Sequence, residues 1–281
     1  MRRREFLLGT GVVGTLGSVG VVSTLVGDID VRWWATERAA QYPDLHERVE
    51  GYLRRGFEGF ALSANVSYGG VTSFDTESAY RLVVEGMWPR RLVTGTAEGR
   101  HLPVDDVNLL VTDSSMRRAP TGAGVPYVAA VGGARELARA PPADSVGPVV
   151  PDSLPMRTVQ ILLHECGHAL GLQHDHGSIR ESDDGSGVVV SPMVSGYAWA
   201  ARPLERRQFN FETNRCGRPY SSVVGKDRHL LLRFDACERR GIYQYRLPAL
   251  PASPLTGLTA EERLRQRLPC ETCALASPEE H

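Results

Sequence analysis

One stretch of the chain, from His164 to Asp175, carries residue types and spacings that suit a metal site: His-Glu-Cys-Gly-His-Ala-Leu-Gly-Leu-Gln-His-Asp. His164 and His168 are four residues apart, so on a helix they share one face and can bind one metal ion. Glu165 lies between them, beside the open coordination position. There it can accept a proton from a water molecule on the metal, which makes it the candidate catalytic residue.

A third ligand follows after a predicted chain reversal. Gly171 tolerates a positive φ, so the helix can end there and the chain can turn back. The turn allows His174 to supply a third nitrogen. Three protein ligands plus water form the open arrangement of a catalytic zinc ion, so we predict one Zn²⁺ on His164, His168 and His174.

The same residues resemble the metzincin clan of zinc metallopeptidases, whose motif is H-E-x-x-H-x-x-G-x-x-H. The clan also has a methionine-containing turn beneath the metal, and the segment 191–197, with Met193, is the candidate. His168 to Leu172 is similar to matrixins, whereas Asp175 after the third histidine is similar to adamalysins. Tyr197 is four residues past the methionine, rather than two as in some members, and is given no catalytic role.

The resemblance implies a zinc-dependent endopeptidase that cleaves peptide bonds of protein substrates, with Glu165 as general base. Two alternatives are a zinc hydrolase of a non-peptide amide or ester, and a zinc-stabilised extracellular binding module without turnover. The intact Glu165 argues against the binding module, because a structural zinc site needs no such carboxylate. A redox function of Cys270 and Cys273 is a further, weaker alternative.

The resemblance also implies an α+β fold, with a mixed twisted sheet, packed helices, an active-site helix and a smaller C-terminal subdomain below the zinc cleft. Hydrophobic and helical spacing predict the elements independently. They are strands at Ile29–Trp34, Ala61–Tyr68, Val107–Thr112 and Pro126–Val131, helices from Pro43 to Phe57, from Asp75 to Glu85 and from Met156 to Leu170, and a loop from Ala140 to Pro155. The strand Pro126–Val131 is the candidate for the edge strand that binds substrate, with an ordinary internal strand as the alternative.

The ends of the chain are predicted to lie outside this domain, which is expected to span residues 28–247. Residues 1–27 have the composition of an export signal, and Arg3-Arg4-x-Phe6-Leu7 resembles a twin-arginine signal, with a general secretory signal as the alternative. Either cleavage or retention as an anchor through residues 6–27 is compatible with this segment, so the protein is expected to be secreted or held at the cell surface. Residues 248–281 form a tail with a short predicted helix at Thr259–Leu268.

The net charge and the cysteines bear on the possible partners and disulfides of the protein. The chain has 281 residues and a formal charge of −1, which gives no indication of a nucleic-acid partner, and nothing in it indicates an oligomeric state. Cys166 is expected to be a small buried residue of the metal helix. Cys216, Cys237, Cys270 and Cys273 could form two disulfides in three connectivities, and for Cys216 a bond to Cys237 is expected in preference to a thiolate switch on zinc.

Other possible ligands lie near the motif. His176 is a spare candidate, although His174 has the family spacing. Asp183 and Asp184 could bind Ca²⁺, but an exposed acidic turn is the favoured interpretation.

Overall fold

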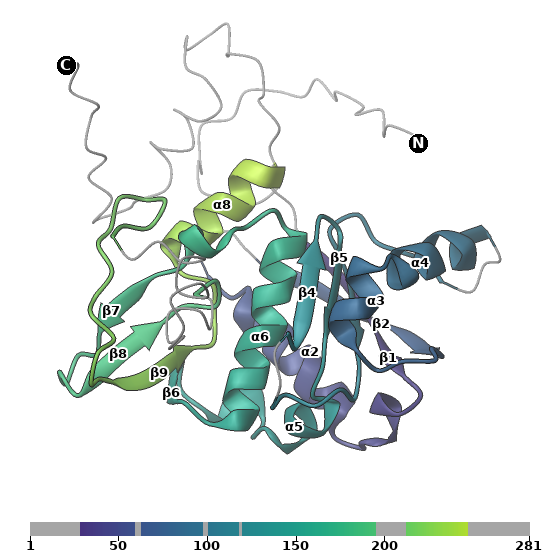
Figure 1. Ribbon diagram of the computed structural model, residues 1–281, viewed down its shortest axis with the longest axis horizontal. Coiled ribbons are helices and arrows are strands. Elements are labelled where there is room, and N and C mark those ends of the chain that lie inside the picture. The colour runs from purple at the N-terminus through teal and green to yellow at the C-terminus, as the bar shows by residue number, and fades with distance from the viewer. Residues whose placement is uncertain (1–28, 60–62, 98–100, 118–119, 195–211, 247–281) are drawn as a thin grey trace, which may run out of the picture.

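The computed structural model describes residues 29–59, 63–97, 101–117, 120–194 and 212–246, which form an α+β fold of two mixed sheets with packed helices (Figure 1). The fold class predicted from the sequence is therefore confirmed. The first sheet contains β1 (Ile29–Thr36), β2 (Ala64–Thr72), β3 (Val107–Val111), β4 (Gly122–Val125) and β5 (Val128–Val131). The helices around it are α2 (Leu45–Gly56), α3 (Ala79–Val84), α4 (Met87–Ala97), α5 (Ala134–Arg139) and α6 (Leu154–Ala169).

The first sheet has the strand order β2-β1-β3-β5-β4, and its pairs are parallel except that β4 runs antiparallel to β5. Successive side chains of a strand point to opposite faces. Trp33 and Leu109 accordingly join the larger core, which contains residues of α2 and α6, whereas Trp34 and Leu110 pack with α3 and α4. Apolar residues on both faces are what a covered parallel sheet requires.

The second sheet comprises β6 (Val149–Pro151), β7 (Ile179–Glu181), β8 (Gly187–Val190) and β9 (Asp227–Leu231), in the order β6-β9-β8-β7. Helix α6 lies between the two sheets and contacts β4 and β5 on one side and β9 on the other (Figure 1). Val190 and Leu230 join the same core as Leu162 of α6. The helix that carries the histidine motif is thus held from two sides.

Several predicted elements are confirmed, including the first strand, the first helix, the buried strand at Val107 and the motif helix. The second strand begins and ends a few residues later than expected. The helix predicted to start with Asp75 is capped instead by Ser78, whose hydroxyl accepts a hydrogen bond from the Arg81 N–H at 3.4 Å. The predicted loop 140–155 contains β6 and a short 3₁₀ helix at Ala143–Ser145, and α4 was not predicted.

The candidate edge strand was wrong, and the alternative of an ordinary internal strand is confirmed. The strand predicted at Pro126–Val131 is β5, which pairs with β3 on one side and β4 on the other. The edge on this side of the sheet is β4, a glycine-rich segment with little apolar alternation. A β-carbon at Gly124 would lie 2.5 Å from the Glu165 carbonyl oxygen and 2.6 Å from the His168 β-carbon. Glycine is therefore required for β4 to lie directly against the motif helix.

We predict that Gly124→Ala lowers the free energy of unfolding by about 2 kcal/mol, because the added methyl group must push β4 and α6 apart. Urea denaturation measures the change. The matched control is Gly147→Ala, since a β-carbon there makes an ordinary contact at 3.5 Å with the Val149 carbonyl oxygen. Equal stabilities of the two variants would contradict the close packing of β4 on α6.

Candidate metal centre

Helix α6 has clear signals at both ends. The Ser153 hydroxyl accepts a hydrogen bond from the Met156 N–H at 3.5 Å, and Pro155 lies in the first turn, where its missing N–H costs nothing. At the other end Gly171 adopts φ +79°. The Leu172 N–H donates to the Gly167 carbonyl at 2.9 Å, which closes the helix with the hydrogen-bond pattern typical of a terminal glycine.

This turn brings the three predicted ligands together. His164 and His168 lie on one face of α6, and His174 begins a 3₁₀ helix, His174–His176, beyond the turn. The centroids of the three imidazole rings are 4.6 to 5.1 Å apart. Their candidate ligand atoms all lie within 4.8 Å of one another, so the three residues form a group that could hold a metal ion.

Two backbone carbonyls fix which nitrogen of each α6 histidine faces the centre. His164 Nδ1 lies 2.8 Å from the Pro192 carbonyl oxygen, and His168 Nδ1 lies 2.9 Å from the Leu172 carbonyl oxygen. A carbonyl only accepts hydrogen bonds, so both Nδ1 atoms carry the proton. Each neutral ring then presents an unprotonated Nε2 as a metal ligand.

The two Nε2 atoms are 3.0 Å apart, so their lone pairs face each other. Such a contact is unfavourable unless a proton or a cation lies between the nitrogens. Burial lowers the pKa of all three histidines, that of His174 to about 4, and neighbouring histidines lower the pKa of His164 and His174 further. A shared proton is thus disfavoured, and a metal cation fits this set of donors.

Glu165, the predicted general base, is buried at the same helix turn, and burial raises its pKa to about 8. A β-carbon at Gly122 would lie 2.7 Å from Glu165 Oε1, so β4 also packs against this carboxyl group. A cation on the histidines would lower this pKa again, because an opposite charge favours the ionised carboxylate.

Residues 191–194 are the described part of the predicted methionine turn, and they pack against the motif helix. Met193 is fully buried, and a β-carbon at Gly167 would lie 2.3 Å from its sulfur, so the methionine packs directly against the motif helix. Val194 N–H donates to the Ser191 carbonyl at 3.1 Å, which closes a tight turn. Ser195 to Tyr197 lie outside the described residues.

Sequence reasoning missed the residue that holds this turn. Glu238, in helix α8 (Ala236–Arg246), is fully buried, and its Oε1 accepts hydrogen bonds from the Ser191 hydroxyl at 2.7 Å and the Met193 N–H at 2.6 Å. Its Oε2 accepts a third from the Asp235 N–H at 2.7 Å. Burial and the charge of Asp235 raise the pKa of Glu238, and these three donors oppose the shift. Nothing in the local sequence distinguishes this glutamate from a surface one.

The other residues singled out in the sequence lie outside the histidine triad. His176 is buried apart from the triad, and its Nδ1 accepts a hydrogen bond from the Gln173 N–H at 3.0 Å. Asp184 accepts hydrogen bonds from Ser182 and Ser186 in an acidic turn, and within the described ranges the histidine triad is the one group identified as able to hold a metal ion. Cys166 is a buried free thiol, and the expected Cys216–Cys237 disulfide is present.

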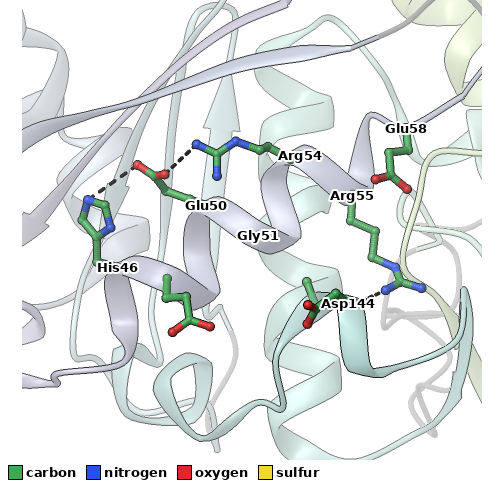
Figure 2. Close-up of a pocket in the computed structure, with 9 residues that line it drawn as sticks. His46, Glu50, Gly51, Arg54, Arg55, Glu58 and Asp144 are labelled. Atoms are coloured by element: carbon green, nitrogen blue, oxygen red, sulfur yellow. Dashed lines mark hydrogen bonds and ion pairs between the residues drawn. The ribbon is translucent and has the colours of Figure 1, made fainter.

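A groove of about 470 Å³ runs along α2 and is lined by none of the three histidines (Figure 2). Figure 2 shows Glu50 between His46 and Arg54. Glu50 Oε1 lies 3.5 Å from His46 Nε2, and Glu50 Oε2 lies 2.6 Å from Arg54 Nη2. Arg55 donates hydrogen bonds to the Ala143 and Val146 carbonyls across the groove. These charged groups have partners within the fold, and the groove is separate from the candidate metal centre.

Comparisons with known proteins add little to this geometry. No family model matches the sequence, and no curated protein matches it. Among solved structures, the chain is similar to one titled "Structure of a chaperone-substrate complex", with a TM-score of 0.39 and 11% sequence identity over 78% of this chain and 34% of the other. At that TM-score the likeness carries no argument about the fold or function of this chain.

The disulfide indicates an extracytoplasmic location, because such bonds persist in oxidising compartments. In the part of the chain that the structure describes, no helix has the length and hydrophobicity to cross a membrane. The predicted export signal at 1–27, the tail at 248–281 and its helix lie outside the described residues, as do Cys270 and Cys273.

We predict that His174→Ala lowers Zn²⁺ affinity at least about 100-fold, because even residues that only orient ligands contribute 10- to 100-fold. His176→Asn should retain the affinity of the parent protein, since the Asn side chain can still accept the Gln173 hydrogen bond. Competition with a coloured chelator measures both variants. If His176→Asn lost Zn²⁺ affinity and His174→Ala retained it, the third ligand would be His176.

Proposed function

We propose that this protein is a zinc-dependent endopeptidase of the metzincin type, which hydrolyses peptide bonds with Glu165 as general base. The observation that carries the proposal is the convergence of the three histidines around one point, with Glu165 beside them on the same helix. Both features are what water-mediated hydrolysis at a metal requires. The buried Met193 under the helix agrees with this assignment.

His164, His168 and His174 would hold a Zn²⁺ ion, which would supply Lewis acidity toward a water molecule and toward a carbonyl oxygen of the substrate. Glu165 accepts the proton of the attacking water and then delivers it to the leaving amine nitrogen. Its buried position keeps bulk water away from this proton transfer. The Pro192 and Leu172 carbonyls keep the His164 and His168 rings oriented throughout.

An extended peptide substrate is favoured over a small amide or ester by the position of β4. This strand is at the end of its sheet, and no other described strand pairs with its outer side. Because Gly122 packs against the Glu165 carboxyl group, a peptide that adds to this edge would lie next to the catalytic residue. We therefore place the substrate along β4, rather than along β5 as the sequence had indicated.

The remaining assignments follow from the sequence together with the disulfide. We propose that residues 28–247 form the catalytic domain, that residues 1–27 direct export through a twin-arginine-type signal, and that the protein acts outside the cytoplasm, secreted or at the cell surface. Oxidising conditions there are those in which the Cys216–Cys237 bond persists.

We predict that Glu165→Gln retains one Zn²⁺ per protein but lowers kcat for cleavage of a denatured casein-type substrate at least about 100-fold, because general-base catalysis contributes that much or more. Elemental analysis and a cleavage assay with and without chelator measure the two properties. Wild-type turnover in this variant would remove Glu165 from its role. A wild-type protein that binds zinc and cleaves simple esters but no peptide would favour the non-peptide hydrolase.

A further inference from the structure

Arg215, the residue before the disulfide-bonded Cys216, holds the segment that carries His174, the predicted third ligand. Asp175 follows His174 directly, and its carbonyl oxygen accepts a hydrogen bond from the Arg215 N–H at 2.7 Å. Its carboxylate Oδ2 lies 3.1 Å from Arg215 Nε. Two contacts thus fix the start of the 3₁₀ helix to the segment that contains Cys216.

Glu238, the residue after the disulfide-bonded Cys237, supports His164, the predicted first ligand, through the turn around Pro192. Glu238 follows Cys237 and accepts hydrogen bonds from the residues on either side of Pro192. The Pro192 carbonyl, fixed between them, is the partner of His164 Nδ1. The position of helix α8 therefore determines the position of the carbonyl that orients His164.

The Cys216–Cys237 bond joins these two supports covalently, across 21 residues of sequence. We propose that this disulfide positions His174 and His164 relative to each other, so that full zinc affinity requires the oxidised pair. The inference deepens the proposed function, on which it rests, because it makes assembly of the metal centre depend on the redox state of the compartment.

Oxidation would proceed by thiol–disulfide exchange with an external disulfide. The Cys216 and Cys237 thiols lose two protons and two electrons, and the external disulfide is reduced to two thiols. Cys216 is partly exposed and Cys237 is buried, so Cys216 is the residue within reach of the exchange partner. A chain held reduced before export would bind zinc weakly and cleave poorly, which restrains its activity in the cytoplasm.

The reference is the full-length chain with Cys270→Ser and Cys273→Ser, in which Cys216 and Cys237 remain. The test variant carries Cys216→Ala and Cys237→Ala in addition, so only this pair of cysteines differs between the two proteins. Competition with a coloured chelator should give a Zn²⁺ dissociation constant at least about 10-fold higher without the disulfide, the effect expected for groups that orient ligands. Equal dissociation constants would overturn the inference.

Unfolding measurements separate positioning from general stabilisation. A disulfide that only staples the fold would lower the stability of the metal-free and zinc-loaded forms by the same amount. A positioning role requires a larger loss in the zinc-loaded form, because a ligand stabilises the native state in proportion to its affinity. Equal losses in both forms would count against the inference.

If the alanine pair does not fold, two variants that retain the disulfide carry the test. Arg215→Ala and Glu238→Gln should each raise the zinc dissociation constant, whereas Arg180→Ala, which removes an exposed ion pair with Asp183 at 3.4 Å, should not. Wild-type affinity in both supporting variants would overturn the inference. These tests measure zinc affinity and stability and do not depend on cleavage. If the protein binds zinc in this manner but cleaves no peptide in the assay above, the proposed peptidase is refuted and this inference stands.

Discussion

The candidate centre depends on keeping two imidazole rings in one tautomer. His164 and His168 each direct Nδ1 at a backbone carbonyl, and this leaves both Nε2 lone pairs directed at the same point, 3.0 Å apart. Without those carbonyls either ring could turn or change tautomer, and the donors would not converge. Burial reinforces the arrangement, since it favours the neutral rings that a metal ion requires.

The two carbonyls are secured in different ways. The Leu172 carbonyl is local, because the Gly171 turn returns the chain to the end of α6. The Pro192 carbonyl comes from the turn that contains Met193, which is held by the buried Glu238 carboxyl group of α8. Leaving any of the polar groups around Glu238 without a partner in this buried position would cost on the order of 1–3 kcal/mol. The hydrogen bonds of Glu238 thus stabilise the fold and also hold the carbonyl that orients His164.

Close backbone packing sets the other boundary of the site. Gly122 and Gly124 allow β4 to lie against the turn of α6 that carries Glu165 and His168, while Gly167 allows Met193 to approach the same helix from another direction. With the two sheets on either side, α6 has little freedom to shift. The donors are therefore preorganised by the packing of the helix as well as by their own hydrogen bonds.

The sequence by itself determined the parts that depend on local spacing. The histidines four residues apart, the glycine that ends the helix and the third histidine predict the triad, and apolar periodicity predicts β1, α2, β3 and α6. Only the tertiary structure identified β4 as the edge strand and Glu238 as the support of the methionine turn. A glycine-rich strand has no apolar pattern to reveal it, and a glutamate becomes a buried acceptor only when α8 meets a turn 45 residues away in sequence. Such contacts arise from packing between distant segments, which local residue spacing does not encode.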